Sequence, residues 1–324
     1  MNELTICTVS YGHKKLIEAN IDLFKKYNSE VDVSWIIVEN ASQNMDRFEI
    51  GKFSNVDVLS GLERHESRIA SGSYHHASGL NIAVKEAKTR FVLVLDPDFF
   101  IINKNWAADV INHMKENDLV FFGVPYNPKR YLKYRYFPCI HCLFIDTEKI
   151  SKNEINFAPQ YAKELHGQKN KKKTKTGFFS LLKSHARIIL KRSQVIGSSR
   201  DTGYALYEKY GKSNSAKSEC VAPVFKLKAS KIKPTYLASM PNLLLEKILP
   251  DRLCYIPKNP GYYTQNGFKE LDYPDFYGND WDEFIWKGKP FGFHVQGAKK
   301  DGTIRSNDEV IPTLKKLTTE FEKI

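Results

Sequence analysis

The sequence predicts an α/β protein with a mainly parallel central sheet flanked by helices. Short apolar runs alternate with amphipathic segments over residues 1–150, and strands that alternate with helices form parallel sheets through right-handed crossovers. Beyond about residue 130 the long periodic segments give way to Tyr, Phe, Pro and charged residues. We therefore expect a sheet-forming part at residues 1–150 and an irregular part at residues 151–324.

Runs rich in Val, Ile, Leu and Phe predict the strands. The predicted strands are 4–9, 33–38, 56–59, 91–95, 119–124 and 136–145. Apolar residues three and four apart predict the helices, as in Leu80, Ala83 and Val84 of segment 77–87. The other predicted helices are 14–27 and 106–117, whereas the aromatic segment 255–293 is expected to be loop-like.

The most informative strand, 91–95, ends in Asp96-Pro97-Asp98. In an open α/β sheet ligands bind outside the carboxyl ends of the strands, so both carboxylates are expected in a ligand site. Two carboxylates close together favour a hard divalent cation such as Mg²⁺ or Mn²⁺, and such a cation favours phosphate oxygens. The alternative is a solvated turn that merely ends the strand.

Composition indicates a globular chain with one basic insert. Hydrophobic residues make up 42% and charged residues 27% of the 324 positions, which argues against disorder. Of the net charge of +12, segment 163–192 carries +9, because it holds eight Lys, two Arg and one Glu. Its part 177–192 has the pattern of a basic amphipathic helix, which is typical of a helix lying on an anionic membrane. The alternative is a helix that packs on the protein's own core.

The sequence also bears on nucleic-acid binding, on the cellular compartment and on a candidate zinc site. Nucleic acid is not expected, because the excess charge lies in one amphipathic segment rather than along a groove. No signal peptide and no membrane-spanning stretch are recognisable, and five scattered Cys suggest a reducing cytoplasm. Cys139-Ile140-His141-Cys142 lacks a second pair, so core cysteines are favoured over a zinc site.

Several segments together resemble glycosyltransferase family 2, with the GT-A fold. They are the first strand with its loop, Glu39-Asn40-Ala41-Ser42 after the second strand, Gly79-Leu80-Asn81-Ile82-Ala83, and Leu95-Asp96-Pro97-Asp98. Two weaker matches follow, at Ser199-Arg200-Asp201-Thr202-Gly203-Tyr204 and at Phe293-His294-Val295-Gln296-Gly297. The resemblance covers residues 3–150 and implies a nucleotide-sugar-binding half followed by an acceptor-binding half.

The resemblance also implies roles for individual residues. Asp98 and His294 would bind the metal, and Asp201 would be the catalytic base. Glu39 stands where the family more often has Asp, and Arg200 precedes Asp201 where Glu is more usual; this basic neighbour would lower the pKa of Asp201. The residues implied in nucleotide-sugar binding are Val9, Ser10, Tyr11, Glu39, Asn40, Ser42, Asn81 and Asp96. The pair His75-His76 is interpreted as the polar start of a helix or as a contact to diphosphate or acceptor.

The implied activity is a metal-dependent, inverting transfer of a sugar from a UDP- or GDP-sugar to a glycan or lipid-linked acceptor. The metal would be Mn²⁺ or Mg²⁺, and the acceptor would belong to cell-surface polysaccharide synthesis at the inner face of the membrane. A sugar-phosphate nucleotidyltransferase is the first alternative, although the loop after the first strand offers only Gly12 before His13-Lys14-Lys15. The second is a non-catalytic module that binds a membrane or polyanion through the basic insert.

Overall fold

The computed structural model describes residues 3–41, 45–49, 53–61, 72–130, 133–159, 201–226, 250–251, 254, 256–295 and 307–323. The basic segment 163–192 and Ser42 lie outside the described residues. Within the described ranges, no helix has the length and apolar character needed to cross a bilayer.

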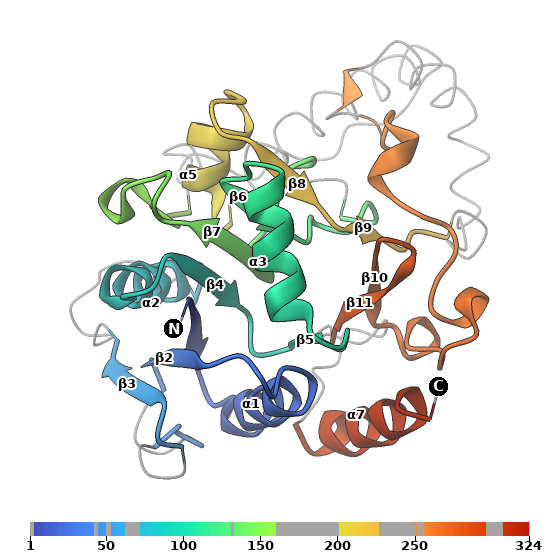
Figure 1. The fold of residues 1–324 in the computed structure, drawn as a ribbon, viewed down its shortest axis with the longest axis horizontal. Coiled ribbons are helices and arrows are strands. Elements are labelled where there is room, and N and C mark those ends of the chain that lie inside the picture. Colours follow the sequence, from blue (N-terminus) through green and yellow to red (C-terminus); the bar gives the residue numbers. More distant parts are fainter. Residues whose placement is uncertain are drawn as a thin grey trace, which may run out of the picture.

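Seven strands form the larger sheet, in the order β3-β2-β1-β4-β7-β6-β8 (Figure 1). Four of its six neighbouring pairs are parallel, and β7 is antiparallel to both β4 and β6. The expectation of a mainly parallel α/β sheet is confirmed. The strands are β1 (Leu4–Ser10), β2 (Val33–Glu39), β3 (Val56–Ser60), β4 (Phe91–Leu95), β6 (Phe121–Gly123), β7 (Cys142–Asp146) and β8 (Ser218–Cys220).

Helices cover both faces of this sheet, which explains why its central strands β1 and β4 are buried along their whole length. Alternate residues of β1 point to opposite sides, since side chains alternate along a strand. Leu4 and Ile6 belong to the core shared with α1 (Lys14–Tyr27) and α3 (Trp106–Glu116). Cys7 and Val9 belong to a second core, shared with α2 (Gly72–Glu86).

A second, antiparallel sheet has the order β5-β11-β10-β9. The strands are β5 (Phe99–Ile101), β9 (Ala222–Pro223), β10 (Asp282–Trp286) and β11 (Lys289–His294). The loop-like expectation for 255–293 is wrong for β10 and β11. They form a hairpin whose two turn residues, Lys287 and Gly288, both have positive φ (49° and 73°), as a tight two-residue turn requires.

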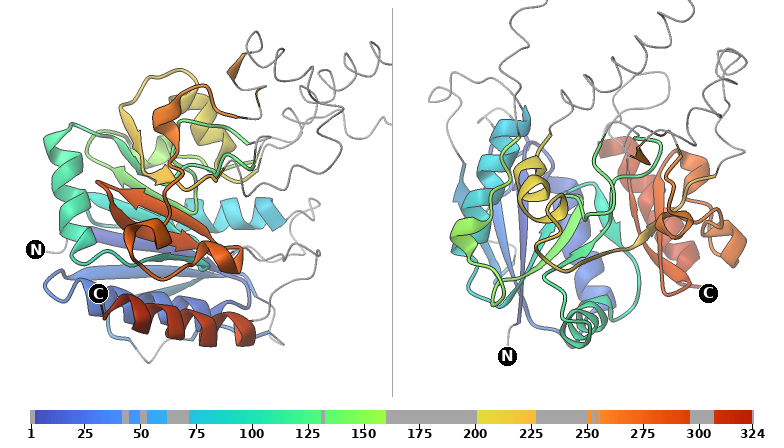
Figure 2. Two further views of the ribbon diagram at one scale, coloured as in Figure 1. Left: turned by 90° about the vertical axis from the view of Figure 1, so that its right-hand side faces the viewer. Right: turned by 90° about the horizontal axis from the view of Figure 1, so that it is seen from above.

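The C-terminal helix α7 (Asn307–Phe321) packs against α1 (Figures 1 and 2). Glu322, just after α7, accepts a hydrogen bond from the Tyr27 hydroxyl at 3.3 Å and pairs with Lys26. The remaining helical pieces are short: η1 (Lys152–Glu154), α5 (Tyr204–Leu206), η3 (Tyr207–Gly211), η6 (Pro260–Tyr262), η7 (Lys269–Leu271) and η8 (Tyr277–Asn279).

Two element boundaries differ from the sequence prediction by more than two residues. Helix α2 begins at Gly72 rather than at residue 77, so that His75 and His76 lie in its first turns. The strand expected at 136–145 is restricted to Cys142–Asp146, because Tyr136 has a positive φ of 61° that a strand does not allow. Each sheet also takes strands from both sides of residue 150, and the division of the chain there stays a prediction.

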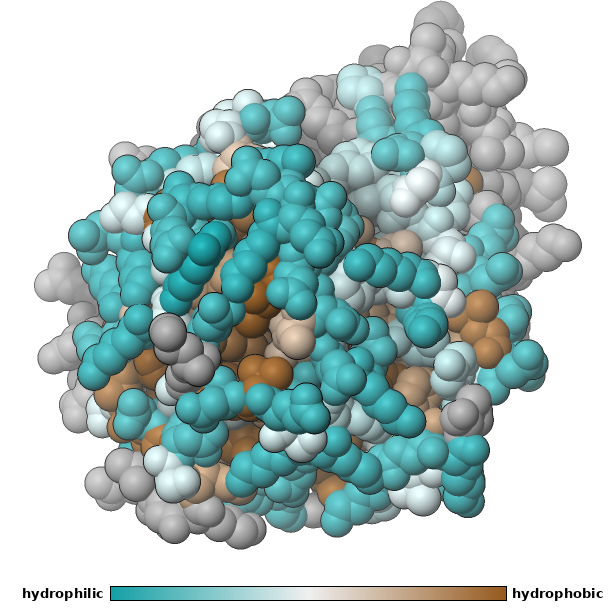
Figure 3. Space-filling view, viewed as in Figure 1, coloured by the Kyte–Doolittle hydropathy of each residue, from teal (hydrophilic) through white to brown (hydrophobic). Residues whose placement is uncertain are grey.

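The face seen in Figure 1 is mainly hydrophilic, with hydrophobic atoms visible in the hollows between polar side chains (Figure 3).

The second sheet contains a buried carboxyl group, that of Glu283 on β10. It accepts hydrogen bonds from the backbone N–H groups of Phe268 and Tyr277, both at 2.8 Å. Glu283 therefore holds the aromatic segment that leads into β10. Burial raises its pKa to about 7 despite these two bonds.

Replacing Glu283 should change how stability depends on pH. A carboxyl group whose pKa is raised by folding stabilises the native state fully below its unfolded pKa of 4.5, and this contribution is lost as the pH rises through about 7. From pH 4.5 to 8 we expect the free energy of unfolding of the wild type to fall, relative to Glu283→Gln, by on the order of 2 to 3 kcal/mol. Urea denaturation at both pH values measures this difference, and Glu30→Gln, at an exposed site, is the control. Parallel pH profiles of wild type and Glu283→Gln would contradict it.

Candidate active site

A cavity opens where three parallel strands end. β1, β2 and β4 run side by side, with Ser10 opposite Glu39, and their carboxyl ends meet at one edge of the larger sheet. The cavity has a volume of about 390 Å³, which falls within the range of small-molecule sites. Its lining residues are Val9, Tyr11, His13, Asn40, Gly72, His75, His76, Asp96, Pro97 and Asp98.

Asp96, directly after β4, is the buried acid of the site at 8% exposure. One of its oxygens, Oδ2, lies 2.7 Å from Nδ1 of His141, and the other, Oδ1, lies 3.3 Å from Nε2 of His76. His141 is held there because β7 pairs with β4 and the Asp96 N–H donates to the His141 carbonyl at 3.0 Å. Burial alone would raise the pKa of Asp96, but His76 and His141 hold it well below its ordinary value.

Asp98 meets His294 because the smaller sheet brings them together. β5 begins at the residue after Asp98 and pairs with β11, so that Phe99 lies opposite His294. The N–H of Val295 also donates to the carbonyl of Asp98 at 2.9 Å. In this arrangement Nε2 of His294 lies 3.3 Å from Oδ1 of Asp98. Two sequence-predicted metal ligands, nearly 200 positions apart in the chain, are thus neighbours in the fold.

Carboxylates surround the histidines of the site. Burial lowers the pKa of His294, but the charges of Asp98, Asp282 and Asp96 outweigh it and the net shift is upward. For His76 burial is likewise outweighed, mainly by Asp96. These upward shifts mean that the carboxylates favour a positive charge at the cluster, and a bound cation would supply one.

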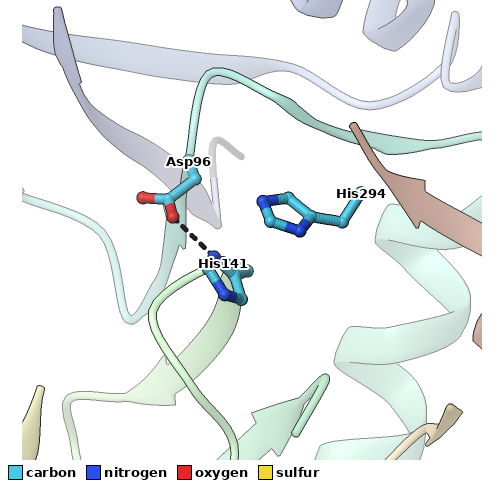
Figure 4. A group of neighbouring side chains, drawn as sticks. All are labelled: Asp96, His141 and His294. Carbon is cyan, nitrogen blue, oxygen red and sulfur yellow. Dashed lines mark hydrogen bonds and ion pairs between the residues drawn. The ribbon is translucent and has the colours of Figure 1, made fainter. Parts of the chain in front are cut away.

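Asp96, His141 and His294 form a group that can hold a metal ion. Their candidate ligand atoms all lie within 4.8 Å of one another, and Figure 4 shows the three side chains turned toward one shared space. The rings of His141 and His294 are stacked at a centroid distance of 4.1 Å. Carboxylate oxygens suit Mg²⁺ and Mn²⁺, whereas imidazole nitrogens suit transition metals. This mixed donor set fits a divalent ion and favours Mn²⁺ over Mg²⁺.

Asp201, the expected base, sits beside the first turn of α2. Its Oδ2 accepts from Lys133 Nζ at 2.6 Å, and its Oδ1 accepts from the Ser73 hydroxyl and, at 2.9 Å, from the N–H of Thr202. The Thr202 hydroxyl in turn donates to the Ser73 carbonyl at 3.0 Å. Burial would raise the pKa of Asp201, but Lys133 and these donors lower it below the ordinary range. At neutral pH Asp201 is therefore a carboxylate.

Glu39 organises the loop that follows β2. It is 4% exposed, and its two carboxylate oxygens accept from the N–H groups of Ala41 and Phe48, both at 2.7 Å. The neighbouring Asn40 does line the cavity, and its amide donates to the carbonyl of His75 at 3.0 Å. This bond ties the loop after β2 to helix α2 across the cavity.

The other sequence-predicted residues divide into two groups. Val9 and Tyr11 line the cavity, and Tyr11 is 37% exposed. Ser10 is fully buried, and its hydroxyl has no hydrogen-bond partner among the described residues. Asn81 lies farther along α2, where its side-chain oxygen accepts from the Phe157 N–H at 3.0 Å. Glu39, Ser10 and Asn81 are not among the cavity-lining residues that the structure describes.

The sequence did not single out three residues that the site contains. For His76 the sequence leaves open a polar helix start or a contact to diphosphate or acceptor, His141 stands out only within a Cys-containing tetrapeptide, and Lys133 carries no signal. No spacing rule joins His141 to Asp96, because their contact depends on the antiparallel pairing of β4 with β7. His76 had a usable signal, since it directly precedes the apolar pattern of residues 77–87, and in the structure it lies in the first turns of α2.

The comparisons with known proteins find similarity at the level of structure. No protein-family model matches the chain, and neither does any curated protein sequence. A mannosyltransferase of Pyrobaculum calidifontis, solved with GDP-Man and Mn²⁺, aligns with a TM-score of 0.35 and 12% identity over 48% of this chain and 47% of its own. The chain thus spans about half the length of this mannosyltransferase.

Two further solved structures are similar. TarS of S. aureus in complex with UDP-GlcNAc aligns over 94% of this chain and 99% of its own, with a TM-score of 0.33 and 12% identity. Glucosyl-3-phosphoglycerate synthase of Mycobacterium tuberculosis, with Mn²⁺ and UDP-glucose, aligns over 40% of this chain and 45% of its own, with a TM-score of 0.29 and 16% identity. The chain is therefore similar, at low sequence identity, to structures of glycosyltransferases.

Proposed function

We propose that this chain is a metal-dependent glycosyltransferase that uses a nucleotide-sugar donor. The observation that carries the proposal is the convergence of Asp96, Asp98, His141 and His294 beside a cavity at the carboxyl edge of the parallel strands. A diphosphate leaving group develops negative charge as the sugar departs, and a metal ion at this cluster would supply the Lewis acid that neutralises it. The sequence resemblance to glycosyltransferase family 2 points to the same chemistry.

The chain's own residues then bind the donor and orient it. Val9, Tyr11 and Asn40 border the nucleoside, and the flat, partly exposed ring of Tyr11 offers a face for a base. Glu39 keeps the loop with Asn40 in place through its two backbone hydrogen bonds. Asp98 and His294 would hold the metal, with Asp96 and His141 beside them. Ser10, Ser42 and Asn81 are the other residues to which the proposal assigns nucleotide-sugar binding.

Asp201 takes the proton of the acceptor hydroxyl. A carboxylate on the side of the sugar opposite the diphosphate allows in-line displacement, which inverts the anomeric centre. The donor is a UDP- or GDP-sugar, and the acceptor is a glycan or a lipid-linked saccharide of cell-surface polysaccharide synthesis. Residues 1–150 bind the donor and residues 151–324 the acceptor.

Segment 163–192 holds the protein at the inner, anionic face of a membrane, near a lipid-linked acceptor. Its net charge of +9 supports this part of the proposal, since basic residues near such a surface contribute about 1 kcal/mol each. The full chain should sediment with vesicles that contain phosphatidylserine, and a variant lacking residues 177–192 should not. Equal sedimentation of the two chains would contradict this part.

A donor screen tests the proposed activity. The chain with Mn²⁺ is incubated with individual UDP- and GDP-sugars, and the free nucleoside diphosphate is measured. We expect slow release from one donor, because glycosyltransferase sites let water replace the acceptor at a low rate. If no donor is cleaved, and pyrophosphate is instead released from a nucleoside triphosphate and a sugar phosphate, the chain is a nucleotidyltransferase. If neither reaction occurs, the catalytic proposal fails.

A further inference from the structure

A second concave surface lies at the opposite end of the β10–β11 hairpin from His294. This groove, of about 530 Å³, is walled by the hairpin, by the segment after β5, by the first turns of α3 and by the end of α7. β11 spans six residues between Lys289 and His294, or about 17 Å along a strand. A ligand of the groove is therefore separate from the candidate active site.

The rim of the groove is positively charged. Lys104, Lys287 and Lys289 line it, and Asp109 is the acidic residue among the lining residues that the structure describes. None of the three lysines makes an ion pair within the described ranges, whereas Lys129, Lys133, Lys149 and Lys226 each pair with a carboxylate. Nζ of Lys287 lies 4.6 Å from the centre of the Trp286 ring. Three cations thus face a shared space without a counter-charge of their own.

The floor of the groove is aromatic and rigid. Trp286, Tyr273 and Phe321 line it, and the rings of Tyr273 and Phe321 are stacked at 4.9 Å. The tight turn at Lys287 and Gly288 fixes the hairpin end. The N–H groups after β5 bond to the Phe291 carbonyl at 3.0 and 3.3 Å, which fixes the facing wall. A groove built from regular structure is pre-formed for a ligand, so little ordering cost opposes binding.

We infer that this groove is a docking site for an acidic glycan, that is, a saccharide chain carrying carboxylate groups. Lysines are point charges that suit anions spread along a chain, whereas arginine forks, which suit single phosphates, do not line the groove among the described residues. The half-buried ring of Tyr273 offers an apolar face to a sugar ring, and Asn103 and Asp109 offer partners for hydroxyl groups. The inference stands without the proposed transferase activity.

Lysine footprinting on the full chain tests the inference. The method reports on each lysine separately, so binding of the probe to segment 163–192 is distinguished from binding to the groove. Each lysine's rate of acetylation is measured by mass spectrometry with and without oligogalacturonate as the acidic probe. At a probe concentration ten times Kd, acetylation of Lys104, Lys287 and Lys289 should slow by about tenfold, since bound ligand shields them in proportion to occupancy. The exposed Lys85, Lys88 and Lys217 are the matched controls and should react at unchanged rates. Maltooligosaccharide, which is neutral, should protect none of these residues.

Two further probes test whether the groove recognises the sugar rings and carboxylates together. Polyglutamate carries carboxylates without sugar rings, and oligo-dT carries phosphates with bases; both should protect the groove lysines less than the acidic glycan does. Equal or stronger protection by either probe would overturn the glycan assignment. Protection confined to lysines within 163–192 would overturn the site itself. A Lys287→Gln/Lys289→Gln variant should lose the protection of Lys104, whereas Lys85→Gln/Lys88→Gln should keep it.

Discussion

In an Asp98→Ala variant, Mn²⁺ should no longer raise the melting temperature of the chain in the presence of UDP or GDP. Asp98 lies 3.3 Å from His294 and next to the group formed by Asp96, His141 and His294. Its loss removes a carboxylate from the candidate metal site, so that the remaining residues would hold a cation for the diphosphate less tightly. Ligands that bind only the native state stabilise it by about 2.7 kcal/mol at one hundred times Kd. For a chain of this size this corresponds to a shift of about 5 °C.

The measurement is a thermal melt with nucleotide alone, metal alone and both together. Wild type should show the shift with Mn²⁺ and a smaller one with Mg²⁺ at the same concentration, because imidazole donors favour transition metals. Asp22→Ala, at an exposed position of α1, is the control and should behave as wild type. A full shift in Asp98→Ala, or a full shift with nucleotide and chelator in wild type, would remove metal from the proposed mechanism.

His141→Gln tests whether His141, which the sequence did not predict as a metal ligand, contributes to the metal site. Gln keeps a polar side chain of similar length but cannot supply an imidazole nitrogen. If His141 binds the ion or orients Asp96, Mn²⁺ affinity should fall by about 10- to 100-fold, as measured by calorimetry. An unchanged affinity would leave Asp96, Asp98 and His294 as the site without His141.

The sequence predicted the donor half of the fold well because its signals are local. The five-residue apolar run before Asp96-Pro97-Asp98 is buried as expected and ends at the sheet edge where ligands bind. Val9 and Tyr11 reach the cavity for the same reason, since they end the neighbouring strand β1. At the ends of both β4 and β1, the site residues directly adjoin their strand in the chain. Their position in the site therefore follows from the position of that strand in the sheet.

The parts that depend on distant pairing could not be predicted in the same way. β10 and β11 are short, and their aromatic residues gave no clear alternation, so that segment was expected to be loop-like. Only the pairing of β11 with β5 shows why His294 lies beside Asp98. The position of His141 likewise depends on the pairing of β7 with β4. The helix α7 was missed altogether, and its contacts with α1 join residues nearly 300 positions apart.

Asp201→Asn should abolish sugar transfer while leaving the fold and donor binding intact. The side-chain oxygen of Asn can still accept from Ser73 and from the Thr202 N–H, although the ion pair with Lys133 is lost. What Asn cannot do is take a proton, and loss of a general base costs about 10²- to 10⁴-fold in rate. We expect that loss in kcat, with the KM for the donor unchanged. A variant that retains full kcat would show that Asp201 only anchors helix α2.

Lys133→Met tests whether the ion pair sets the strength of that base. Burial raises the pKa of Asp201, whereas Lys133 is the largest of the influences that lower it, so removing the ammonium must move the pKa upward. The acid limb of the kcat profile should then shift to higher pH, because a larger fraction of Asp201 is protonated at each acidic pH. At neutral pH the carboxylate of the variant is a stronger base, and its rate should be equal or higher. An unshifted acid limb together with an inactive Asp201→Asn would mean that Asp201 acts as a fixed charge rather than as the proton acceptor.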